Sequence, residues 1–170
     1  MVWHLFNKIK QYFLKLRFIK RIQLYRIRSN YRYSEFNIFN KFNRKSSFII
    51  HIPKTAGTSV TKSIYGTDAN YNHYTWEDLN IILKENYFQY FSFTIVRNPW
   101  DRCLSAYEFL RLGGDNEKDR LFYKNNMSRY KNFDEFVKIG LSKKEIHNWI
   151  HFIPQSNYIF SNNDKCMVDY

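Results

Sequence analysis

Apolar and polar residues alternate along this chain in blocks that predict both strands and helices. Two short apolar runs, residues 47–52 and 91–96, have the length of buried strands. Apolar residues at helical spacing predict a helix over 58–65, a second that begins after Thr75, and a third that begins at Pro99. Strands that alternate with helices form mostly parallel sheets, so the pattern predicts an α/β fold in which helices flank a parallel sheet.

The ends of these helices carry start and stop signals. Gly66 follows the first helix, and Thr75 precedes the second with Asp78 in capping-box position. Asn98 is the expected N-cap of the third helix, where Pro99 has no N–H to leave unpaired. We expect the apolar face of this helix to lie toward the sheet and to consist of Trp100, Cys103, Leu104, Tyr107 and Leu110.

The remaining segments have weaker patterns. Residues 1–34 are expected to form an amphipathic arm, and residues 35–46 a linker that leads to the α/β domain at 47–170. Charged and polar residues predict an exposed excursion over 115–131, and 165–169 is a candidate third strand. The apolar face of the arm consists of Leu5, Ile9, Tyr12, Leu16 and Ile19.

The positive charge of the chain is concentrated in the arm. The 170 residues carry a net charge of +12, and nine of the 27 basic residues lie within 1–34, which has no Asp or Glu. A basic amphipathic helix of this kind either contacts an anionic membrane surface or packs on its own domain with a solvated basic face. The other 18 basic residues accompany 15 acidic ones, so the domain is mildly basic and nucleic acid is not an expected partner.

Several protein classes are excluded by composition. Cys103 and Cys166 lie far apart and in no metal-spaced pattern, which argues against a disulfide scaffold and a zinc site. No apolar run reaches the roughly 18 residues of a transmembrane helix. Charged residues interrupt the N-terminus too often for a signal peptide. The length and the 44% hydrophobic content allow one modest domain.

The first candidate site is the loop Pro53–Ser59, which follows the strand at 47–52. Gly57 lets the backbone approach a ligand closely, Lys54 adds a full positive charge, and the neighbouring hydroxyl groups are donors. The loop is similar to a Walker A motif, but Gly57 is followed by Thr58 and not by lysine. That departure argues against hydrolysis of ATP or GTP and requires no metal.

A second candidate site follows the second strand. Arg97 leaves the end of the strand at 91–96, where a guanidinium can bind a phosphate through two hydrogen bonds. Ser105 lies eight residues later on the expected helix, off its apolar face. Asp101 and Arg102 are expected to make local charge pairs or cap contacts. Two anion-binding loops at neighbouring strand ends predict a ligand with two anionic ends.

These two motifs resemble the paired signatures of the Golgi-type and bacterial carbohydrate sulfotransferases, the group related to heparan sulfate 2-O-sulfotransferase. The matching stretches are His-Ile-Pro-Lys-Thr-Ala-Gly-Thr-Ser at 51–59 and Val-Arg-Asn-Pro-Trp-Asp-Arg-x-x-Ser-Ala-Tyr at 96–107. The resemblance implies a P-loop-like sheet and the sulfate donor 3′-phosphoadenosine 5′-phosphosulfate (PAPS). It implies that the 3′-phosphate is bound by Arg97 and Ser105. It implies that the 5′-phosphosulfate is bound by Lys54, Thr55, Ala56, Gly57, Thr58 and Ser59.

Catalytic roles follow from the charge changes of sulfuryl transfer. Lys54 is the expected stabiliser of the departing phosphate, and His73 is the expected base for the acceptor hydroxyl, at a position similar to that of the family's catalytic histidine. His51 is expected to be a packed strand residue, whereas His147 and His151 are weaker candidates. Gln155 belongs to a segment similar to the family's active cleft, without an assigned role. The acceptor that the resemblance implies is a glycan or glycolipid.

Three further expectations complete the hypothesis. The family continues past the equivalent of Tyr170, so the resemblance implies a domain that is incomplete at its C-terminus. The expected location is cytoplasmic, with peripheral contact at an inner membrane, or the Golgi if a eukaryotic anchor precedes the chain. Two other functions stay open: a P-loop nucleotide kinase, which magnesium-dependent ATP binding would indicate, and a non-catalytic module that binds membranes or polyanions.

Overall fold

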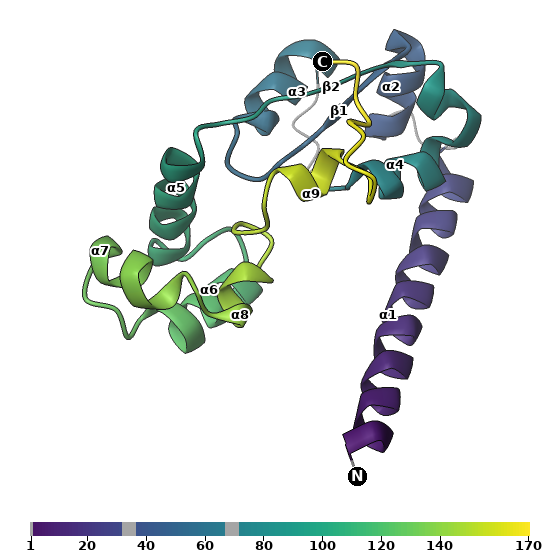
Figure 1. The fold of residues 1–170 in the computed structure, drawn as a ribbon. Coiled ribbons are helices and arrows are strands. Elements are labelled where there is room, and N and C mark those ends of the chain that lie inside the picture. The colour runs from purple at the N-terminus through teal and green to yellow at the C-terminus, as the bar shows by residue number, and fades with distance from the viewer. Residues whose placement is uncertain (1, 32–36, 67–71) are drawn as a thin grey trace.

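The computed structural model describes residues 2–31, 37–66 and 72–170 (Figure 1). Short helices outnumber strands in this part of the chain. The elements, in chain order, are α1 (Val2–Tyr31), α2 (Ile38–Lys45), β1 (Ser47–Ile50), α3 (Gly57–Tyr65), α4 (Trp76–Leu83), the 3₁₀ helix η1 (Lys84–Phe88), β2 (Phe91–Thr94), α5 (Pro99–Arg111), α6 (Glu117–Phe122), the π-helical turn η2 (Tyr123–Met127), α7 (Phe133–Glu135), the π-helical turn η3 (Phe136–Gly140), α8 (Lys144–His147) and α9 (Ser156–Ile159).

The two predicted strands pair in parallel. The register joins Ser47 to Phe91 and Ile50 to Thr94, and α3 and α4 lie between the two strands in the chain. The last three residues of β1 are fully buried, as expected for a parallel strand covered on both faces. The mixed α/β character and the parallel pairing predicted from the sequence are therefore confirmed.

The candidate third strand at 165–169 does not form. An isolated antiparallel bridge joins Phe160 to Cys166, and the last two residues contact β2 through both backbone and side-chain hydrogen bonds. The Asp169 carboxylate accepts hydrogen bonds of 2.8 Å from the backbone N–H and the hydroxyl of Ser92. A carboxylate that takes the N–H of β2 replaces the ladder bond that a third strand would make there.

The predicted linker at 35–46 is wrong for the part that the structure describes. Residues 38–45 form helix α2, which Asn37 caps by accepting a hydrogen bond from the N–H of Phe39. Phe39 and Phe42 are buried, and the Phe42 ring lies 4.9 Å from that of Tyr65. The helix was missed because its buried face is aromatic and short. Residues 35 and 36 of the predicted linker, and 1 and 32–34 of the predicted arm, lie outside the described residues.

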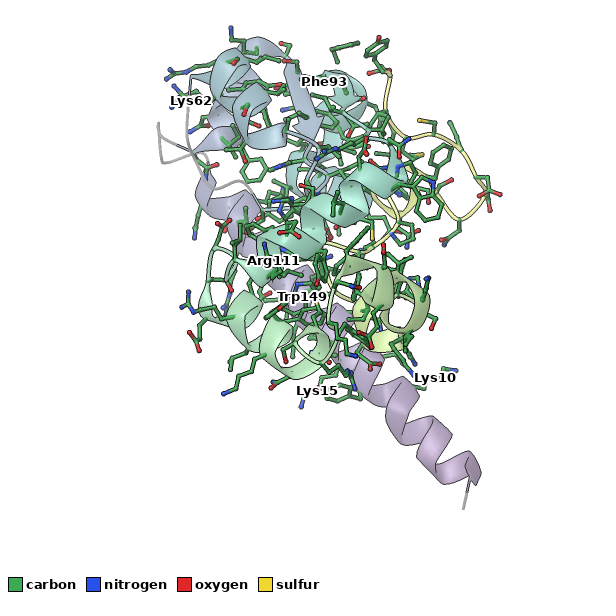
Figure 2. The ribbon with its side chains drawn as sticks, turned by 90° about the vertical axis from the view of Figure 1, so that its left-hand side faces the viewer. Lys10, Lys15, Lys62, Phe93, Arg111 and Trp149 are labelled. Carbon is green, nitrogen blue, oxygen red and sulfur yellow. The ribbon has the colours of Figure 1, made fainter. Side chains whose placement is uncertain are left out.

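The exposed excursion predicted at 115–131 is wrong, because this segment contributes to a second hydrophobic core. This segment forms α6 and η2, and it buries Phe122 and Met127. Phe122 stacks on Trp149 with ring centroids 4.1 Å apart, and Figure 2 shows Trp149 within this group of helices. The other members of this core are Ala106, Tyr107, Leu110, Tyr130, Phe136, Ile146 and Phe152.

Helix α5 packs on this second core and not mainly on the sheet (Figure 1). Its predicted start is confirmed, because Asn98 accepts hydrogen bonds from the N–H groups of residues 100 and 101. Its predicted apolar face is wrong at two positions: Trp100 is 70% exposed and Leu104 is 42% exposed, whereas Ala106 is buried. Helical spacing identified the helix but not the surface on which it packs.

Helix α1 covers the described part of the predicted arm and extends away from the rest of the molecule in Figure 1. Its second half lies against α4, where Leu24 is buried and the Lys20 ammonium lies 2.8 Å from the Asp78 carboxylate. Asp78 also completes the predicted capping box with Thr75. In the described part of the chain, no helix has the length and apolar content needed to cross a membrane.

Candidate active site

The two motifs that the sequence predicts to bind anions line one cavity of about 370 Å³. The cavity lies beyond the ends of β1 and β2, where parallel sheets bind their ligands. A guanidinium nitrogen of Arg97 donates a 3.4 Å hydrogen bond to the carbonyl of Lys54, so the two loops are in direct contact. Of the predicted site residues, the cavity brings together Lys54, Ala56, Gly57, Thr58, His73, Arg97 and Ser105.

Two predicted residues lie outside this lining. Thr55 is buried, and its hydroxyl donates a 2.9 Å hydrogen bond to the carbonyl of Ile52. Ser59 is exposed on the first turn of α3 and does not line the cavity. Thr55 therefore stabilises the turn between β1 and α3, and the hydroxyl that lines the cavity from this turn is that of Thr58.

The loop between β1 and α3 has a backbone conformation that lets a ligand approach it closely. Lys54 and Ala56 have φ values of 67° and 65°, in the left-handed region that costs energy for residues with a Cβ. Gly57 begins α3, and a Cβ at this position would lie 1.9 Å from Cδ2 of the His51 ring. The loop is thus built around the His51 ring, and the N-terminus of α3 opens on the cavity, where it favours an anion.

The Lys54 ammonium lies inside the cavity, 3.8 Å from the centroid of the Phe109 ring. Burial lowers the pKa of Lys54 from its ordinary value, and the nearby Arg97 lowers it further, whereas Asp115 and Asp119 raise it. A half-buried ammonium that lies on an aromatic face has lost part of its hydration. It is therefore placed to interact strongly with an anion that enters the cavity.

One ring nitrogen of His73 is hydrogen-bonded to a backbone carbonyl. Its Nδ1 lies 2.9 Å from the carbonyl oxygen of His51. A carbonyl can only accept, so Nδ1 carries the proton and Nε2 has a free lone pair. Burial lowers the pKa of His73, and Arg102 and Lys54 lower it further, although the bond to His51 raises it. The imidazole is therefore neutral at pH 7 and can accept a proton, as the sequence-based hypothesis requires.

Gln155 and Arg102 have positions that the sequence did not reveal. The Gln155 amide bonds the backbone of Arg97 twice, because its Oε1 accepts from the N–H at 3.0 Å and its Nε2 donates to the carbonyl at 2.8 Å. Arg102 was expected to make local contacts, but it is buried and donates to the carbonyls of Pro53 and Ile153. These bonds hold together the segments that carry Lys54 and Arg97.

A histidine–carboxylate pair on the second core was also missed. His151 Nε2 lies 3.5 Å from Asp119 Oδ1, both side chains are buried, and His151 lines the cavity beside Phe109. Burial lowers the pKa of His151 to about 4 although Asp119 raises it, so the ring is neutral at pH 7. Asp115 lines the same cavity. The spacing Asn116–Asp119 was a capping signal that the sequence already contained. His147 is exposed and lies outside this cavity.

Comparison with known protein families agrees with this geometry. The model of the sulfotransferase family matches residues 37–170, from the N-cap of α2 onward. This chain belongs to the sulfotransferase family. Comparisons with curated proteins and with solved structures give no significant match.

Membership confirms the resemblance found in the two motifs and makes the chain a member of a family of transferases. The matched segment includes every residue named in the cavity and excludes α1. Within residues 2–31, 37–66 and 72–170, no cluster of His, Cys, Asp or Glu is arranged to hold a metal ion.

Proposed function

We propose that this sulfotransferase moves a sulfuryl group from PAPS to a hydroxyl group of a glycan or glycolipid. The observation that carries the proposal is the cavity shared by the Lys54 loop and Arg97. A donor with a phosphosulfate at one end and a 3′-phosphate at the other needs two separate cationic positions that face the same space. Lys54 with the α3 N-terminus suits the first end, and Arg97 with Ser105 suits the second.

The residues of the cavity have complementary roles in this reaction. His73 Nε2 takes the proton of the acceptor hydroxyl, while the bond from Nδ1 to His51 keeps the ring in the required tautomer. Lys54 stabilises the negative charge that develops on the departing phosphate. Gln155 acts on the reaction through Arg97, whose backbone it positions. The mechanism needs proton transfer and charge stabilisation, and no metal.

Binding of the reaction product adenosine 3′,5′-bisphosphate tests the proposal. We expect it to raise the melting temperature of the protein, because a ligand that binds only the folded state stabilises it. Arg97→Ala should weaken binding by roughly tenfold or more, since a charge-assisted pair is lost. Arg111→Ala is the matched control, because that arginine lies at the far end of α5, the helix that follows Arg97, and pairs with Glu108 outside the cavity.

The same titration separates the proposal from the kinase alternative. Absence of any thermal shift or calorimetric signal with the bisphosphate, in a folded sample, would contradict donor binding. Tighter binding of ATP with magnesium than of the bisphosphate would support a P-loop kinase.

We also propose that α1 contacts an anionic membrane surface, which would place the enzyme in the cytoplasm at the inner membrane of a bacterium. The helix exposes large apolar side chains among its basic residues; Figure 2 shows Lys10 and Lys15 on it. The exposed apolar residues are Tyr12, Leu14, Leu16, Phe18, Ile19, Ile22 and Tyr25. Apolar contact together with positive charge suits anionic lipid, whereas a second copy of so basic a helix would be repelled.

Vesicle sedimentation tests the membrane contact. The protein should pellet with vesicles that contain phosphatidylglycerol and not with pure phosphatidylcholine, and high salt should weaken the binding. Phe18→Ser should reduce pelleting, whereas Phe88→Ser, which changes a similarly exposed phenylalanine on η1, should not. Equal pelleting with both vesicle types, or a salt-independent dimer in solution, would contradict the proposal.

A further inference from the structure

The cavity extends beyond the two positions that suit the donor. Helix α5 has 13 residues, so it spans about 20 Å, and Arg97 lies just before its N-terminus. Ser105 and Phe109 follow along the helix, and the Lys54 ammonium lies on the Phe109 ring. Asp115 lines the cavity from the segment just after the far end of α5. The lining therefore runs from Arg97, through Lys54, to an end marked by Asp115.

The charged side chains along this lining differ in sign. Lys54 and Arg97 are its two lysine or arginine side chains among the described residues, and the proposed donor engages both. The other formal charge in that lining is the carboxylate of Asp115. Its charge raises the pKa values of both Lys54 and His73, although burial lowers each of them more, so the carboxylate acts on the ammonium and on the proposed base. His73 and His151 add no charge there, because burial lowers their pKa values.

The segment that carries Asp115 is held firmly. The backbone N–H of Asp115 donates a 3.2 Å hydrogen bond to Oδ2 of Asp119, and the Asn116 amide donates to the same oxygen at 2.8 Å. Gly114 has a φ of 60°, and a Cβ on it would lie 2.2 Å from the Cβ of Asp119. The Asp119 side chain is buried beside His151. The backbone of Asp115 is thus fixed by these bonds, and its exposed carboxylate lines the cavity.

We propose that Asp115 makes this sulfotransferase select acceptors that are uncharged or carry an amino group, and reject glycans that carry carboxylates or sulfates. This inference rests on the proposed function. A polyanionic acceptor requires cations at its own end of the site, because the donor already neutralises Lys54 and Arg97. The described acceptor end offers a carboxylate instead, which repels an anion and attracts an ammonium or a hydroxyl donor.

Transfer of labelled sulfate from PAPS to matched oligosaccharides tests the inference. Each set shares one backbone and contains a neutral form, a form oxidised to the C6 carboxylate, and a 2-amino form. We expect kcat/KM for the neutral and amino forms to exceed that for the carboxylate by about tenfold or more. Asp115→Asn should reduce this ratio about tenfold, mainly through KM for the carboxylate form. Asp134→Asn, an exposed carboxylate of α7 that does not line the cavity, should leave the ratio unchanged.

Failure of the inference and failure of the proposed function are distinguishable. If the protein does not bind adenosine 3′,5′-bisphosphate, the sulfotransfer proposal itself is wrong. If it binds the bisphosphate but prefers the carboxylate forms, sulfates no neutral or amino form, or keeps the same ratio in Asp115→Asn, the acceptor selection proposed here is wrong.

Discussion

Replacement of Lys54 with alanine is expected to reduce kcat by about 10²–10³-fold, the effect of removing one preorganised charge or donor from a developing anion. The ammonium lies in the cavity on the Phe109 ring, where partial desolvation strengthens its interaction with a phosphate. The measurement is single-turnover sulfate transfer at saturating PAPS, so that weaker donor binding does not hide the effect on the chemical step.

A matched lysine variant separates this effect from general loss of charge. Lys138→Ala removes an exposed lysine of η3 and should leave kcat unchanged. The melting temperature of Lys54→Ala should stay close to that of the parent, because alanine keeps the same left-handed backbone strain and the substitution removes a charge that burial disfavours. Transfer by Lys54→Ala at the parental rate would show that another group stabilises the leaving phosphate.

Replacement of His73 with asparagine is expected to reduce kcat by about 10²–10⁴-fold while binding of adenosine 3′,5′-bisphosphate is retained. Asparagine can keep a donor near the carbonyl of His51, but it cannot accept the acceptor proton at neutral pH. Calorimetry of the bisphosphate and steady-state kinetics on the same preparations give the two readouts. His147→Asn is the control, since that side chain is exposed outside the cavity.

The dependence of kcat on pH tests the same assignment. A general base acts in its neutral form, so activity falls as pH drops through the pKa of His73, and burial places that pKa below the ordinary 6.5. Lys54 acts in its charged form, so activity also falls at high pH, beginning below the ordinary 10.5 because burial lowers its pKa. An acidic limb that persists unchanged in a residually active His73→Asn would assign the base to another group, and His151, which lines the same cavity, is one alternative.

Prediction from the sequence was most accurate where the signal is local. The parallel strands, the capping box at Thr75, the stop at Gly66 and the start of α5 at Pro99 are all present. The helix starts and stops depend on residues within about four positions of one another, so neighbouring side chains and backbone groups decide them. The parallel pairing was predictable because helices alternate with the two strands along the chain. The shared placement of Lys54 and Arg97 was also predictable, because parallel strands deliver their C-terminal loops to the same edge.

Prediction failed where residues far apart in the chain decide the structure. Helix α2 was assigned to a linker because its aromatic residues become a core face only against β1 and α3. The excursion predicted at 115–131 is helical because Phe122 stacks on Trp149, which lies in a later segment. Polar residues outnumber apolar ones there, so the local pattern indicated exposure, while burial of a few large side chains decided the outcome.

The sequence by itself determined the family of this protein, the two loops proposed to bind anions, and the two strands that bring these loops to one edge, since these depend mainly on neighbouring residues. Only the tertiary structure decided which groups complete the cavity. Gln155 is hydrogen-bonded to Arg97, 58 positions away in the chain, and Arg102 to Pro53, 49 positions away. His151 pairs with Asp119 within the second core. Such contacts depend on how two hydrophobic cores pack around α5, and that packing is a property of the whole chain.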